Sequence, residues 1–307
     1  RQRMYALNFM EITTPILTCS SPEGARDYLV PARNHPGKFY ALPQAPQQFK
    51  QILMASGFDR YFQIAPCFRD EDARADRSPG EFYQLDMEMA FASQEDVFSI
   101  EQVLPPVFEK YGIYKEASKA PFVRIPYLEA MDKYGSDKPD LRIDLVLTDA
   151  TEVMQGCGFA AFEGQTVKAI VVDGFTATRK QIDAICAEVE VQTARKGFWF
   201  RVDENGEFVG GISKFLQDRK EEVIKALGLK NGDFVGLAAG KKLEAQKTAG
   251  VYRKLLGAAS EKHMKKDCYE FCWIVDFPMY EIGEESGELE FCHNPFSMPQ
   301  GGMDALN

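Results

Sequence analysis

The sequence predicts an α+β protein in which an antiparallel sheet is combined with helices. Residues 82–91 alternate between apolar and polar side chains, which is the period of a half-buried strand. Residues 94–111 instead place their apolar side chains at helical spacing. From about Leu141 onward, short strand-like runs alternate with helix-like runs and glycines mark the joins, which indicates a second α+β module.

The composition is that of a globular chain. Its 307 residues are 45% hydrophobic, and no apolar run approaches the roughly 18 residues that a membrane span needs. The net charge of −10 argues against nucleic-acid binding by the whole surface but allows a local basic groove. The seven cysteines are scattered and form no C-x-x-C pair, so we expect reduced thiols in a cytoplasmic protein and no metal site in this chain.

The first sixty residues are expected to contain two helices and two strands. Arg1–Asn8 has the pattern of a helix end, and Phe9–Thr13 that of a short strand. A further strand is expected at Gly37–Leu42, and a helix at Gln47–Ser56 that ends at Gly57.

Two longer strands, Tyr61–Arg69 and Phe82–Phe91, are predicted to form an antiparallel hairpin around a charged loop. On the second strand, Gln84, Asp86 and Glu88 share one face. This polar face could be a solvated surface with weak ion pairs. It could equally be the floor of a cleft, with carboxylates for an ammonium group and Arg69 for a phosphate. Patterning alone favours neither interpretation.

The second module has its own strands and helices. Strands are expected at Ile143–Leu147, Val167–Val172 and Phe198–Val202, and helices at Thr178–Val189 and Ser213–Leu227. A helix at Lys247–His263 then leads back to the first part, where Cys272–Asp276 and Leu289–Cys292 are expected to resume antiparallel strands.

Six segments, in order along the chain, resemble the class II aminoacyl-tRNA synthetases in their bacterial aspartyl form. Phe68–Glu88 resembles motif 2, and Phe9–Leu17 resembles the end of motif 1. Four more segments are similar to the flipping loop, the amino-acid-binding segment and two runs typical of the bacterial aspartyl enzymes: Ser21–Tyr28, Leu42–Lys50, Tyr134–Arg142 and His293–Ser297. Six matches in order are far more specific than a single short motif.

The resemblance implies a class II antiparallel-sheet core interrupted by an inserted α+β domain of the GAD type. The core would comprise residues 1–142 and 248–307, and the insertion residues 143–247. It also implies an aspartate–tRNA ligase that uses ATP and Mg²⁺, forms aspartyl-adenylate and charges tRNA(Asp). Members of the family are cytoplasmic homodimers, and we expect the same here.

The resemblance also implies roles for individual residues. Arg69 would be the catalytic residue that binds the ATP α-phosphate and the substrate carboxylate, with Asp70 and Glu71 beside it at ATP. Aspartate would be bound by residues that match the family's amino-acid site: Glu23, Gln47, Lys50, Arg69, Asp86 and His293. Lys50 would face the side-chain carboxylate of aspartate, and Glu23 and Asp86 would face its ammonium group.

Each of these residues also has an ordinary structural interpretation. Lys50 could be a solvated lysine, Glu23 could occupy the first turn of a short helix, and His293 could be a core histidine. The motif 2 loop departs from the family pattern at Ser78, where many relatives carry Gln, so an ATP contact there stays open. Asn294 stands where some relatives have a second histidine, and this leaves tRNA(Asn) open as a second substrate.

We further expect this chain to be part of a longer protein. The resemblance places an anticodon-binding OB-fold before Arg1, and motif 3, the magnesium ligands and a second aspartate-binding arginine beyond Asn307. The 307 residues alone are therefore expected to be inactive. Two alternatives remain: an asparaginyl-type or amide-forming class II paralogue, and a non-catalytic binding module derived from a synthetase.

Overall fold

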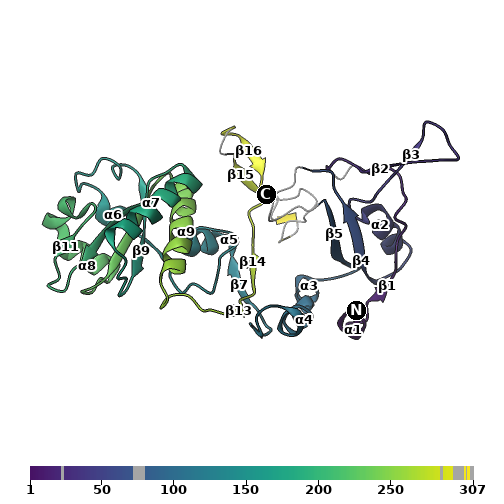
Figure 1. Ribbon diagram of the computed structural model, residues 1–307, viewed down its shortest axis with the longest axis horizontal. Helices are drawn as coiled ribbons and strands as arrows, with labels where there is room; N and C mark the ends of the chain where they lie inside the picture. The colour runs from purple at the N-terminus through teal and green to yellow at the C-terminus, as the bar shows by residue number, and fades with distance from the viewer. Residues whose placement is uncertain (22–23, 72–79, 284–285, 293–300, 302, 305–307) are drawn as a thin grey trace. The chain divides into compact units, whose positions relative to one another are not determined.

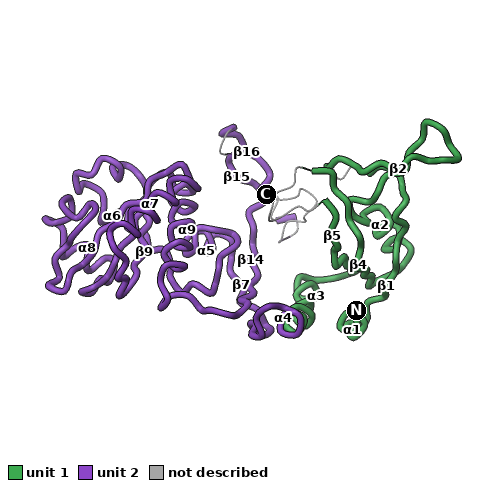
Figure 2. Tube along the Cα trace, in the orientation of Figure 1, with its two compact units in different colours: residues 1–107 green, residues 108–307 purple. Residues whose placement is uncertain are grey.

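The computed structural model describes residues 1–21, 24–71, 80–283, 286–292, 301 and 303–304. The chain forms two compact units, residues 1–107 and 108–307, which are coloured separately in Figure 2. In the described ranges, no helix has the length and apolar character required to cross a membrane.

Unit 1 is built around a three-stranded sheet in the order β1-β4-β5 (Figure 1). Its elements are α1 (Gln2–Ala6), β1 (Met10–Glu11), β2 (Leu29–Pro31), β3 (Phe39–Ala41), α2 (Gln47–Ala55), β4 (Arg60–Phe68), β5 (Glu81–Met89), α3 (Gln94–Phe98) and a 3₁₀ turn (Ser99–Gln102). Helix α4 (Leu104–Tyr111) follows and spans the boundary between the units.

The predicted long hairpin is confirmed. β4 and β5 pair antiparallel along their whole length, from Arg60 opposite Met89 to Phe68 opposite Glu81. On β4, Tyr61 and Phe62 are fully buried, as expected for the central strand of the sheet. The helix predicted at Gln47–Ser56 and the strands predicted near the N-terminus are also present, with ends that differ by a few residues.

On β5, two apolar side chains are more exposed than the polar ones beside them, which is the reverse of what the alternating pattern predicts. The apolar side chains Tyr83 and Leu85 are 67% and 43% exposed, whereas Gln84, Asp86 and Glu88 on the opposite face are only partly exposed. The polar face is covered because Lys50 of α2 reaches Asp86 and Glu88. The interpretation as a fully solvated face is therefore wrong for Asp86, whereas a role of this face in binding a ligand stays a prediction.

Unit 2 contains a five-stranded antiparallel sheet in the order β11-β10-β12-β9-β8. The strands of this sheet are β8 (Leu147–Asp149), β9 (Thr166–Val172), β10 (Phe198–Val202), β11 (Phe208–Val209) and β12 (Phe234–Gly240). Its helices are α6 (Thr151–Met154), α7 (Arg179–Thr193), α8 (Lys220–Leu227) and α9 (Lys242–Ala259).

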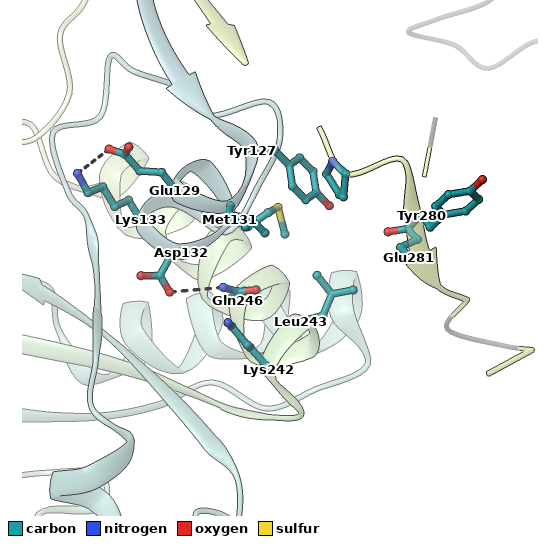
Figure 3. A pocket seen from close by; sticks show the side chains of 12 residues that line it. Tyr127, Glu129, Met131, Asp132, Lys133, Lys242, Leu243, Gln246, Tyr280 and Glu281 are labelled. Carbon is teal, nitrogen blue, oxygen red and sulfur yellow. Dashed lines mark hydrogen bonds and ion pairs between the residues drawn. The ribbon is translucent and has the colours of Figure 1, made fainter. Parts of the chain in front are cut away.

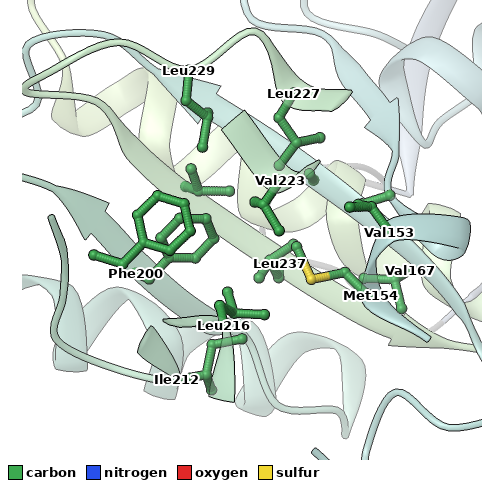
Figure 4. Packing of buried hydrophobic residues seen from close by; sticks show 14 of the residues in the cluster. Val153, Met154, Val167, Phe200, Ile212, Leu216, Val223, Leu227, Leu229 and Leu237 are labelled. Carbon is green, nitrogen blue, oxygen red and sulfur yellow. The ribbon is translucent and has the colours of Figure 1, made fainter. Parts of the chain in front are cut away.

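Two apolar clusters lie on the two faces of this sheet. One packs residues of α6 and α8, such as Met154 and Val223, against Phe200 and Leu237 of the sheet (Figure 4). The other packs Ile182 of α7 and residues of α9 against alternate positions of the strands. Because β12 is buried on both faces, its sequence is a continuous run of small and apolar residues.

The remaining elements of unit 2 are short. They are β6 (Glu116–Ala117), β7 (Val123–Pro126), α5 (Tyr127–Tyr134), two 3₁₀ turns (Ser213–Phe215 and Gln217–Arg219), β13 (Cys268–Tyr269), β14 (Cys272–Val275), β15 (Tyr280–Ile282) and β16 (Leu289–Phe291). The pair β15–β16 is antiparallel, as predicted for the second of its strands.

Several expectations for this unit are wrong. β14 pairs parallel, not antiparallel, with β7, because the entire five-stranded domain forms the crossover between them. The helix expected at Ser213–Leu227 begins only at Lys220, after two 3₁₀ turns, and the strand expected at Ile143–Leu147 lies at Leu147–Asp149. The five-stranded sheet falls within residues 143–247, but the proposed domain boundaries stay a prediction.

Candidate functional site

The candidate site is centred on the ammonium group of Lys50. Lys50 lies on α2, and its Nζ is 2.9 Å from Oδ1 of Asp86 and 2.7 Å from Oε1 of Glu88 on β5. The side chain of Lys50 is 14% exposed, so it is not an ordinary solvated lysine. Burial alone would lower the pKa of Lys50, but its hydrogen bonds to Glu88 and Asp86 outweigh this effect and raise its pKa.

The two carboxylates meet Lys50 because they are two residues apart on one strand. Side chains at such positions point to the same face of a sheet. Asp86 is the more buried of the two, with 10% of its side chain exposed against 37% for Glu88. The Lys50–Asp86 pair is thus a partly desolvated ion pair, whereas Glu88 keeps contact with solvent.

Two polar atoms beside this cluster have no hydrogen-bond partner within the described ranges. They are the hydroxyl of Tyr61 and Oδ2 of Asp86, and both are buried. Burial and the negative charge of Asp86 raise the pKa of Tyr61, so the phenol stays neutral and can donate a hydrogen bond. The Tyr61 phenol is thus a neighbouring donor for the Asp86 carboxylate, and both groups are buried among the protein's own side chains.

Arg69 lies at the end of β4, on the same hairpin as Asp86. Its backbone N–H donates to the carbonyl of Gly80 at 2.8 Å, and its guanidinium lies 5.1 Å from the ring centroid of Phe82. Behind it, the buried thiol of Cys67 is 3.2 Å from Oε1 of Gln84, and burial raises the pKa of this thiol. The aromatic contact holds Arg69 where the strand ends and the loop begins.

Asp70 ties this strand end to the segment around Arg26. The backbone N–H of Asp70 donates to the carbonyl of Arg26 at 3.0 Å, and Nε of Arg26 donates to the carbonyl of Asp70, also at 3.0 Å. Glu71, the next residue, is exposed. Asp70 therefore has a structural role in addition to the ATP contact predicted for it.

Gln44 anchors the same segment from the other side. Its side chain, 1% exposed, accepts from the N–H of Ala25 at 3.1 Å and donates to the carbonyl of Ala25 at 2.8 Å and to Asp27 at 2.6 Å. Sequence reasoning missed this residue, because a single glutamine between prolines carries no periodic signal. It also missed the ion pair of Glu88, although that residue shares the face of Asp86.

The structure brings together part of the predicted site. Lys50 and Asp86 are in contact, Gln47 lies one turn before Lys50 on α2, and Arg69 lies at the end of the paired strand. Glu23 and His293 lie outside the described residues, and so does Ser78. The roles of all these residues stay predictions.

A separate groove of about 740 Å³ lies in unit 2, between α5 and α9 (Figure 3). Its floor carries Asp132, whose Oδ1 accepts from Gln246 at 3.4 Å and from Nζ of the buried Lys168 at 2.5 Å. No residue of the predicted site lines it. Across the described part of the chain, no group of three histidine, cysteine or carboxylate side chains could hold a metal ion.

Comparison with known proteins gives a consistent result. The family model described as tRNA synthetases class II (D, K and N) matches residues 1–306. An aspartate–tRNA ligase of Streptomyces coelicolor is 55% identical over 309 residues, covering 100% of this chain and 52% of that protein. An aspartate–tRNA(Asp/Asn) ligase of Rickettsia prowazekii is 55% identical over 314 residues, with the same coverage. The chain thus spans about half the length of the curated relatives it matches.

A solved asparaginyl-tRNA synthetase from Pyrococcus horikoshii, bound to asparaginyl-adenylate, also matches in structure. It is 16% identical, and the match covers 83% of this chain and 64% of that one, with a TM-score of 0.35. This likeness is too low to support an argument about the site.

Proposed function

We propose, from the premise that this chain belongs to the class II tRNA synthetases (D, K and N), that the whole protein is an aspartate–tRNA ligase. It would activate L-aspartate with ATP to form aspartyl-adenylate and transfer the aspartyl group to tRNA(Asp). The observation that carries the proposal is the partly buried ammonium group of Lys50, which pairs with Asp86 and Glu88 on β5.

This arrangement suits an amino acid that has a second carboxylate. A lysine ammonium has three donors, and Asp86 and Glu88 take two of them. The third can bind the side-chain carboxylate of aspartate. An asparagine amide would be bound less well, because it offers the ammonium no charge.

Neighbouring groups fit the rest of the substrate. Asp86, which pairs with Lys50, would face the substrate ammonium group together with Glu23, as the resemblance implies. Gln47 would bind the amino acid from α2, and His293 would close over it. Arg69, with Asp70 and Glu71 beside it, would bind ATP at the end of the hairpin.

The reaction needs positioning and charge more than a side-chain nucleophile. The α-carboxylate of aspartate attacks the α-phosphorus of ATP, and the bond to pyrophosphate breaks. A ribose hydroxyl of the tRNA then attacks the carbonyl of the mixed anhydride and releases AMP. Arg69 would bind the phosphate as negative charge builds up on it. We assign Mg²⁺ no step on the described residues, among which no group of three histidine, cysteine or carboxylate side chains could hold a metal ion.

Aspartate-dependent exchange of pyrophosphate into ATP by the full-length protein tests the proposal. We expect exchange with aspartate to exceed exchange with asparagine by several orders of magnitude. A preference for asparagine would indicate the asparaginyl-type alternative, and no exchange with either would indicate a non-catalytic module.

The comparisons favour neither tRNA specificity over the other, because relatives named for tRNA(Asp) and for tRNA(Asp/Asn) are equally similar. We propose tRNA(Asp) as the main substrate and tRNA(Asn) as a second one. Charging of purified tRNA(Asn) at a rate within tenfold of that for tRNA(Asp) would support the dual specificity, and a rate at background would contradict it.

We also propose that the full-length protein is a homodimer that associates through the N-terminal edge of unit 1. β1 is an edge strand of the sheet, its residue Met10 is 55% exposed, and Leu17, later in the same N-terminal segment, is 54% exposed. Sedimentation of the full-length protein checks this: Met10→Glu combined with Leu17→Glu should shift it toward monomer, and a wild-type protein that is already monomeric would contradict it.

A further inference from the structure

The β2–β3 hairpin of unit 1 is a surface that the reaction described above does not use. Its strands pair from Leu29 opposite Ala41 to Pro31 opposite Phe39. The connecting tip is tightly hydrogen-bonded, with the N–H of Ala32 and the carbonyl of Lys38 3.0 Å apart. The tip stands clear of the rest of unit 1 in Figure 1.

The hairpin carries only positive charge. Acidic residues outnumber basic ones in the chain, 46 to 36, yet residues 29–41 contain no acidic residue. Arg33, His35 and Lys38 are all exposed, and none of them forms an ion pair with another residue in the described ranges. Unpaired cations on an acidic protein are available to an anionic partner.

Two aromatic side chains lie directly beside these cations. Phe39 and Tyr40 are 56% and 40% exposed and, as neighbours on β3, point to opposite faces of the hairpin. Exposed aromatic rings next to Arg and Lys are the combination that binds unpaired bases and the phosphates between them.

The geometry points to RNA as the partner and argues against strand addition by another protein. Pro31 lacks an N–H and lies on β2, so that edge of the hairpin is a poor template for a further strand. The hairpin also leads directly into the candidate site. Ala41 pairs with Thr18 at its base, and Gln44 and α2 with Lys50 follow in the chain.

We infer that the β2–β3 hairpin is a tRNA contact surface, in which Arg33 and Lys38 bind phosphates and Phe39 or Tyr40 stacks on an unpaired base near the acceptor end. The inference rests on the proposed function for the identity of the RNA. It assigns the hairpin to the transfer step, so the adenylation step should not depend on it.

The experiment measures two quantities on the full-length protein: the Kd for transcribed tRNA(Asp) by fluorescence anisotropy, and aspartate-dependent ATP–pyrophosphate exchange. The test variants are Arg33→Glu/Lys38→Glu and Phe39→Ser. The matched control is Lys180→Glu/Lys230→Glu, which makes the same charge change at two exposed lysines of unit 2.

We expect the charge reversal to raise the Kd roughly tenfold or more and to reduce the slope of log K against log salt by roughly two. Phe39→Ser should raise the Kd for tRNA(Asp) about fivefold. The control should stay within about twofold of wild type, and exchange should be unchanged in all three variants.

The two proposals fail in different ways. If wild-type protein binds tRNA(Asp) but shows no aspartate-dependent exchange, the proposed function fails, and the binding assay still tests the hairpin. If exchange is normal and both hairpin variants bind tRNA like wild type, the inference is overturned. It is also overturned if tRNA binding falls only because the hairpin variants become monomeric in sedimentation, since the surface would then be a protein interface.

Discussion

Replacing Lys50 with methionine tests whether the ion pair between Lys50 and Asp86 is buried enough to stabilise the fold. Methionine keeps most of the side-chain volume and removes the charge, so Asp86 loses its partner while 10% exposed. Breaking a buried pair in this way costs about 3–5 kcal/mol of unfolding free energy. Glu88 is 37% exposed and can be hydrated, so its lost pair adds at most about 1 kcal/mol. We therefore expect a loss of about 3–5 kcal/mol, most of it from Asp86.

The loss should depend on pH in a defined direction. Pairing raises the pKa of Lys50 in the folded state, so its stabilisation is fully present below the unfolded value of about 10.4 and is lost as pH rises through the raised folded value. The difference between wild type and Lys50→Met should thus be constant from pH 7 to 9 and shrink above about pH 10.4.

Urea denaturation followed by far-UV circular dichroism measures the loss, and hydrogen exchange of peptides covering β4 and β5 localises it. Lys133→Met is the matched control, because Lys133 pairs with Glu129 at 2.7 Å on an exposed helix surface. It should change stability by less than about 0.5 kcal/mol. Equal, small effects for both variants would refute the buried-pair argument. Lys50→Met/Asp86→Leu should recover much of the loss, since it removes both charges.

Three further predictions follow from buried polar and close-packed sites. Gln44→Leu should cost about 2 kcal/mol by urea denaturation and speed exchange of the amide of Ala25; unchanged exchange would show that Gln44 does not hold that segment. Lys168→Met should cost under about 1 kcal/mol although Lys168 is 1% exposed, because its two carboxylate partners are more than half exposed and can be hydrated; a loss near 3 kcal/mol would contradict this. Gly250→Ala should cost about 3 kcal/mol or more in thermal unfolding, because a Cβ there would lie 2.6 Å from the carbonyl oxygen of Gly135; an unchanged Tm would show that α5 and α9 can move apart freely.

The sequence predicted the elements whose signals are local. The β4–β5 hairpin follows from strict alternation. The helix predicted from Thr178 is α7, which is capped by Thr178, whose side chain accepts from the N–H of Gln181. The role proposed for Lys50 in binding an amino acid rests only on resemblance, since the sequence around Lys50 is also that of a solvated lysine. Its partner Asp86 is 36 residues away, so only the fold brings the two charges together.

Elements that depend on tertiary context were missed or misplaced. β12 was not predicted, because its two glycines and two alanines have low strand propensity and it is stabilised by burial on both faces. The 3₁₀ turns before α8 depend on Trp199, whose carbonyl accepts from the N–H of Ile212. Glycine at 210 and 211 is required there, because a Cβ at either position would lie within 2.5 Å of Trp199.

The parallel pairing of β7 with β14 has a consequence for synthesis of the chain. Val123 and Cys272 are opposite each other in this two-stranded sheet, yet the whole five-stranded domain is translated between them. At roughly 5–20 residues per second, a ribosome needs on the order of ten seconds to deliver β14 after β7 has emerged. The five-stranded sheet, which has an apolar cluster on each face, can complete its folding within that interval. Once this part has folded, fewer flexible residues separate β7 from β14, and the entropy cost of pairing the two strands is lower. The residues between β7 and β14 would therefore help this pair to form.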